Sequence, residues 1–73
     1  MKQQVLLDTG TLVAFINPRD NFHSWAVAEW DNVSPPLLTC EAVFSEACFL
    51  LRKVQGGKEA VITLLENSII QIP

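Results

Sequence analysis

Residues 5–11, VLLDTGT, decide the fold of this 73-residue chain. Three apolar residues that end at a carboxylate are typical of a short strand buried on both faces of a parallel sheet. Residues 9–11 supply turn and helix-capping side chains, and residues 12–16 are apolar enough to form a short helix. We therefore expect the chain to open with a buried strand, a turn and a helix.

The rest of the chain alternates helices with short apolar runs. An Asn-Pro break follows the first helix, and a second helix is predicted to start at Asn21 or Phe22. Thr39 is expected to cap a third helix, and the pair Gly56-Gly57 to stop it. The further elements are a second strand at 37–38, the third helix over about 40–54, a fourth helix over about 58–67 and a third strand at 69–72.

This order, β-α-α-β-α-α-β, predicts an α/β fold with a three-stranded parallel sheet, because strands that alternate with helices join through right-handed crossovers. The chain is 49% hydrophobic and 18% charged, which excludes a disordered tail. Two cysteines and one histidine exclude a Cys/His zinc module and a disulfide-rich scaffold. We expect one domain over residues 1–73.

Charge and hydropathy narrow the function classes further. Eight acidic and five basic residues give a net charge of -3, which argues against binding nucleic acid by charge alone. The first apolar run ends at Asp8 and is too short for the apolar region of a signal peptide. No apolar stretch is long enough to span a bilayer. We therefore expect a cytoplasmic protein without membrane contacts, in which both cysteines are reduced.

Asp8 is the first candidate for a functional carboxylate. It follows the first predicted strand, at the edge of a parallel sheet where ligands bind. The alternative is a capping side chain for the turn at residues 9–11, since Asx turns are common.

Glu46 is the second candidate. On a helix its neighbours three and four residues away are all apolar: Ala42, Val43, Phe49 and Leu50. We therefore predict that Glu46 lies at the margin of the buried stripe, where a carboxylate is usually paired or bound to a metal. The alternatives are an ion pair with Lys53 and an edge glutamate that reaches water.

The two carboxylates are expected to converge, because the third helix leaves its strand at the same sheet edge as Asp8. Ligation by oxygen alone favours Mg²⁺ or Mn²⁺ over zinc. Such a metal activates water and stabilises charge on a phosphate.

These residues together resemble PIN-domain nucleases, including the VapC-type toxins of bacterial toxin–antitoxin pairs. Residues 5–14 look like the opening of that family, and residues 17–20 with His23 and Ala26 are similar to the segment that opens its second helix. Residues 37–39 and 42–47 look like its second strand and the helix with its second acid. The resemblance runs from about Gln4 to Ile72.

The resemblance implies an Mg²⁺-dependent hydrolase that cleaves RNA phosphodiester bonds, with Asp8 and Glu46 as metal ligands and catalytic acids. Thr9 would steady Asp8 or a metal-bound water, and RNA and an antitoxin would be the partners. The family's later aspartates have no counterpart up to Pro73. We therefore expect the first half of a PIN-like fold, which by itself would hold Mg²⁺ weakly.

Two other functions compete with the nuclease. One is a non-catalytic PIN fragment that acts as an interaction module or associates with itself through apolar surface, as a homo-oligomer. The other is a receiver-like module in which Asp8 accepts a phosphoryl group. Such a module needs further acidic residues beside the first strand, and residues 5–7 contain none.

The remaining polar and aromatic candidates favour structural roles. His23 is expected to bond to backbone rather than act as a base, and Cys40 and Cys48 to be small core residues. Trp25 and Trp30 could stack on bases, but their spacing with Phe22 favours packing.

A small basic cluster surrounds the Gly56-Gly57 turn. It comprises Arg52, Lys53 and Lys58, which could contact the phosphates of a nucleic acid or simply form a solvated helix end.

Overall fold

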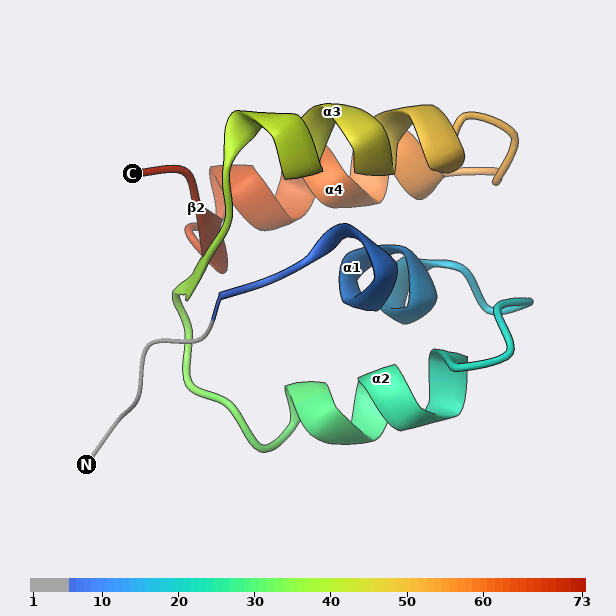
Figure 1. The fold of residues 1–73 in the computed structure, drawn as a ribbon, viewed down its shortest axis with the longest axis horizontal. Helices are drawn as coiled ribbons and strands as arrows, with labels where there is room; N and C mark the ends of the chain where they lie inside the picture. The colour runs from blue at the N-terminus through green and yellow to red at the C-terminus, as the bar shows by residue number, and fades with distance from the viewer. Residues whose placement is uncertain (1–5) are drawn as a thin grey trace.

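The computed structural model describes residues 6–73. Helix α1 is flanked by α2 on one side and by the pair α3 and α4 on the other (Figure 1). The α/β prediction is confirmed. The elements that residues 6–73 form are, in chain order, α1 (Thr9–Ile16), α2 (His23–Trp30), β1 (Leu37–Leu38), α3 (Glu41–Leu50), α4 (Gly57–Glu66) and β2 (Ile70–Gln71).

The sheet is smaller than predicted. Strand β1 pairs in parallel with β2, in a register that places Leu37 opposite Ile70. On the other side of β1, Leu6 forms a single parallel bridge with Leu38, and the Leu7 N–H donates to the Leu38 carbonyl at 2.7 Å. The described residues thus form two strands and one bridge rather than three strands; Val5, where the first strand was predicted to start, lies outside them.

The hydrophobic core lies where α1, α3, α4 and the sheet meet. Leu12 of α1 and Val61 of α4 are completely buried there, as are Ile70 of β2 and Leu51 after α3. Ala47 is the residue through which α3 enters this core. Each described helix and strand thus buries one or two apolar residues.

Thr39 links the sheet segments and does not cap α3, so that prediction is wrong. Cys40 is the N-cap residue of α3, without a side-chain hydrogen bond. The buried Thr39 hydroxyl donates to the Leu7 carbonyl at 3.3 Å, and the Thr39 N–H donates to the Gln71 carbonyl at 2.9 Å. A buried hydroxyl needs a partner, and the acceptor of this one lies across the sheet rather than in the next helix.

Several element boundaries differ from the predictions because of capping. Helix α1 begins at Thr9 rather than Leu12, since Asp8 caps it directly. Helix α3 ends at Leu50 instead of about residue 54, and Gly56, with φ of 72°, is the N-cap of α4. The glycine pair therefore starts α4 and does not stop α3.

The aromatic residues of α2 divide into two groups. Ala26 is buried and the Trp30 ring stacks on Phe15 at a centroid distance of 3.8 Å, which confirms the packing prediction for this part of α2. Phe22 and Trp25 are 66% and 54% exposed, so the same prediction is wrong for them. Helix α2 packs only against α1 among the described elements, and one neighbour cannot cover both sides of its apolar face.

Helix α3 also exposes apolar side chains. Phe49 and Leu50 are 60% and 50% exposed, although Leu50 was predicted on the buried side. Cys40 is exposed, contrary to prediction, and Cys48 is partly buried against the core. No helix formed by residues 6–73 is long and apolar enough to cross a membrane.

Candidate functional site

Asp8 stands at the junction between the bridge residues Leu6 and Leu7 and helix α1. Its Oδ1 accepts the Thr11 N–H at 2.8 Å, so Asp8 does cap the helix, which was the alternative to a functional role. The hydrogen bonds from Thr11 hold the pKa of the Asp8 carboxyl below its ordinary value, against a smaller opposing effect of burial. The side chain is exposed, and it is therefore an ionised carboxylate at neutral pH.

A cavity of about 280 Å³ opens beside this carboxylate. Its polar wall includes Asp8, Thr11 and Asp20, and its aromatic wall comprises Phe22 and Trp25. Gly10 also lines it, and a methyl group added there would lie 3.8 Å from Asp8 Oδ1, an ordinary contact. Thr9, the predicted supporting residue, is half-buried in the first turn of α1 and is not among the lining residues.

Glu46 lies on α3 and is exposed, not at the margin of a buried stripe as predicted. The apolar neighbours that led to that prediction, Phe49 and Leu50, are themselves exposed. Its sequence neighbour Ala47 packs in the core with Leu12, so α3 contacts the helix that Asp8 caps. Residues 6–73 hold no group of three or more His, Cys, Asp or Glu side chains placed to share a metal.

The three residues of the predicted basic cluster have different surroundings. The Arg52 Nη1 donates to the Phe49 carbonyl at 2.7 Å, and its guanidinium carbon lies 3.9 Å from the centre of the Phe49 ring. Arg52 therefore supplies a hydrogen bond to a backbone carbonyl in the last turn of α3. Lys58 is exposed in the first turn of α4.

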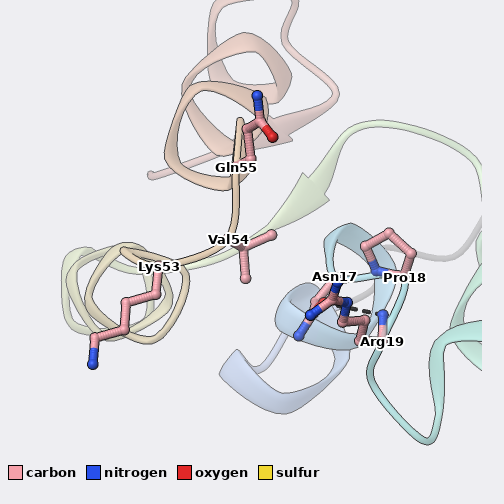
Figure 2. Close-up of a pocket in the computed structure, with 6 residues that line it drawn as sticks. All are labelled: Asn17, Pro18, Arg19, Lys53, Val54 and Gln55. Atoms are coloured by element: carbon pink, nitrogen blue, oxygen red, sulfur yellow. Dashed lines mark hydrogen bonds between the residues drawn. The ribbon is translucent and has the colours of Figure 1, made fainter.

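Lys53 lies instead at a cavity of about 410 Å³ between two turns. One side comes from Lys53, Val54 and Gln55, and the other from residues 17–19, which include Arg19 (Figure 2). Of the residues that the structure describes, those lining this cavity carry two cations and no carboxylate. Because the two segments are distant in sequence, only the fold could bring Arg19 and Lys53 to one cavity.

His23 has the structural role that the sequence predicted. Its Nδ1 lies 2.7 Å from the Ala14 carbonyl oxygen, so this nitrogen donates and attaches the start of α2 to α1. The ring is partly buried, and no lining residue of the Asp8 cavity is a histidine.

Asp20 is the residue near Asp8 that the sequence reasoning missed. The sequence pattern identifies it only as part of the break after the first helix. Its Oδ1 accepts the Phe22 N–H at 2.9 Å, which fixes the turn before α2 and brings Asp20 to the Asp8 cavity. An aspartate three residues before a helix start is a known turn signal, but it does not reveal which cavity the turn lines.

Asp8 follows the bridge residue Leu6 and caps α1. The fold is therefore that of an α/β domain with an acidic side chain at the edge of its sheet, where ligands bind in this class of domain. The family model described as PIN domain matches residues 5–72. The chain therefore belongs to the PIN domain family, which is broadly a family of nucleases. Searches of curated proteins and of solved structures gave no match.

Proposed function

We propose that this chain carries acids of the metal site of a PIN ribonuclease of the VapC toxin type, which hydrolyses RNA phosphodiester bonds. The observation that supports this most is the ionised Asp8 carboxylate beside an open cavity, within a PIN-domain match that covers residues 5–72.

The donor set fits Mg²⁺, or Mn²⁺, in its chemistry. Mg²⁺ keeps several waters and is commonly bound by one or two carboxylates together with phosphate oxygens of the substrate. Asp8 and Glu46 would be those carboxylates, with Thr9 supporting Asp8. When bound, such a metal activates water and stabilises negative charge on the phosphate.

The chain's own residues prepare this site in two ways. The Thr11 hydrogen bond fixes the orientation of Asp8 and keeps it ionised, so the ligand needs no deprotonation. The exposed position of Glu46 on a helix packed against α1 leaves its carboxylate accessible. Two acids in a chain of net charge -3 repel RNA, so RNA is expected to bind only when a cation is present.

Calorimetric titration with Mg²⁺ and Mn²⁺ tests the proposal. The wild-type chain should bind either ion weakly, and both Asp8→Asn and Glu46→Gln should abolish the signal. Glu59→Gln is the matched control, because it removes an exposed acid from α4 and should leave binding unchanged. Unaltered binding in Asp8→Asn would refute the metal site.

Cleavage of RNA is the second readout. Because the chain offers two acids for the metal, we expect little Mg²⁺-dependent cleavage by the chain alone. Robust cleavage that disappears in Asp8→Asn would show that the two acids suffice. A toxin of this type would act in the cytoplasm with an antitoxin as partner, which co-purification from the native cell tests.

A non-catalytic interaction module is the second candidate function. Three exposed side chains favour it: Leu6 at 82%, Phe49 at 60% and Leu50 at 50% exposure. Burial of such side chains against another chain is favourable, because it removes apolar surface from water. Such a module would self-associate or bind an antitoxin without cleaving RNA.

A further inference from the structure

The two tryptophans of α2 have different environments. The Trp30 ring stacks on Phe15 and is thereby used in packing. Trp25 is 54% exposed and lines the cavity beside Asp8, together with Phe22, which is 66% exposed. An aromatic face is therefore available next to the carboxylate that we propose as a metal ligand.

The charge of this cavity restricts what can occupy it. Among residues 6–73, its lining includes two carboxylates, Asp8 and Asp20, and no lysine or arginine. Without a bound cation a phosphate group would be repelled there. An apolar protein surface would bury two carboxylates that each accept one backbone N–H, from Thr11 and from Phe22. A neutral planar ring with hydrogen-bond donors on its edge satisfies both the aromatic wall and the carboxylates.

Asp20 can recognise such donors. Its Oδ1 accepts the Phe22 N–H at 2.9 Å, but a carboxylate has about four lone-pair sites and so retains acceptor capacity. Adenine, cytosine and guanine present an exocyclic amino group, which uracil lacks. Carboxylates accept hydrogen bonds from the amino group of cytosine, and aromatic side chains hold unpaired RNA bases by stacking.

We propose that Trp25 and Asp20 form a nucleobase subsite, in which the base stacks on the Trp25 ring and donates an exocyclic amino hydrogen to Asp20. The base would belong to a nucleotide next to the phosphate that a metal ion bound by Asp8 would hold. This inference rests on the proposed nuclease function for its biological meaning. Base binding itself needs neither a metal nor a phosphate, so it can be tested separately.

The test is a titration of the ¹⁵N-labelled chain with cytidine and with uridine, in buffer without divalent metal, followed by NMR. Cytidine should shift the Trp25 indole N–H in a saturable manner and leave the Trp30 indole unmoved. Trp25→Ala should weaken cytidine binding roughly tenfold or more, since stacking contributes on that scale. Trp25→Phe should retain most of the affinity because it keeps an aromatic face.

Asp20→Asn tests the hydrogen bond, and asparagine can still accept the Phe22 N–H, so the turn is preserved. This variant should lose roughly tenfold in cytidine affinity and little in uridine affinity. Phe49→Ala is the control, because it removes a similarly exposed aromatic side chain outside the cavity and should change neither titration.

Three results would overturn the subsite: no saturable shift of the Trp25 indole, equal affinity for both nucleosides, or equal losses in Asp20→Asn. A Trp25→Ala variant that loses self-association while the wild type ignores nucleosides would assign the surface to a protein contact instead. Because no metal is present, failure of the Mg²⁺ site leaves this experiment interpretable. Conversely, a failed titration leaves the metal titrations of Asp8→Asn and Glu46→Gln unaffected.

Discussion

Asp8 combines a structural and a chemical role in one carboxylate. Its Oδ1 caps α1 while the charge of the group faces an open cavity. The two roles separate by substitution, because asparagine caps a helix as well as aspartate does but carries no charge.

We therefore predict that Asp8→Ala lowers the free energy of unfolding by about 1 kcal/mol and that Asp8→Asn changes it little. Urea denaturation at pH 7 measures both values. An equal loss in the two variants would mean that the charge, and not the cap, stabilises α1.

The free energy of unfolding should also depend on pH through the ionisation of Asp8. The hydrogen bonds from Thr11 lower the pKa of Asp8 in the folded chain, so ionisation favours folding above the unfolded pKa of about 3.9. That contribution disappears as the pH falls through the lower folded pKa. Urea denaturation between pH 7 and pH 2.5 should show a steeper loss below about pH 4 for the wild type than for Asp8→Asn.

At this scale the sequence predicted what depends on local geometry. The cap at Asp8, which the sequence offered as the alternative to a functional role, depends only on residues 8–11. The backbone bond of His23 was predicted without its acceptor, Ala14, which the fold brings to it. The exposure of Trp25 was not predicted, because the same helical spacing describes a covered face and an uncovered one. Which of the two occurs depends on the number of neighbouring elements.

The turn between α3 and α4 depends on one backbone conformation. Gly56 has φ of 72°, and a β-carbon there would meet nothing within 4 Å, so a side chain would cost only backbone strain. Gly56→Ala should lower the free energy of unfolding by about 1–2 kcal/mol, and Gly56→Asn by less, because asparagine tolerates this conformation. Thermal unfolding measures both, and identical midpoints would contradict the strain argument.

The hydrogen bond of Thr39 across the sheet can be tested in the same way. Its buried hydroxyl joins the end of β1 to Leu7, so Thr39→Val leaves the Leu7 carbonyl without this donor. We expect a loss of about 1–3 kcal/mol in the free energy of unfolding. Thr63→Val is the control, since the exposed Thr63 hydroxyl bonds within α4 and its removal should cost less. The idea fails if the two losses are equal.

The order of the elements was predictable, whereas their ends were not. Alternating apolar runs and breaks indicated the α/β arrangement, and the helices occupy the predicted segments to within a few residues. The errors at Thr39 and at the glycine pair arise because capping groups can bond across the sheet or to the following helix. Sequence alone does not rank such partners.

At the scale of the whole molecule, exposed apolar side chains should drive association. The side chains of Leu6, Phe49 and Leu50 are each at least half exposed, and burying them against a second chain would remove apolar surface from water. Sedimentation velocity at micromolar concentration should show species larger than the monomer. Leu50→Gln should shift them towards monomer, and Ile62→Gln, at a position 38% exposed on α4, should shift them less. A strictly monomeric wild type would contradict self-association of the chain.

The placement of β1 between Leu6 and β2 has a consequence for how the chain folds. The contact between Thr39 and Leu7 joins residues 32 apart in sequence, and the pairing of Leu37 with Ile70 spans a comparable distance. Helices form from near neighbours, whereas such pairings must first close long loops, which slows folding. The helices should therefore precede the sheet in time, and the sheet edge that holds Asp8 should be assembled in the last step.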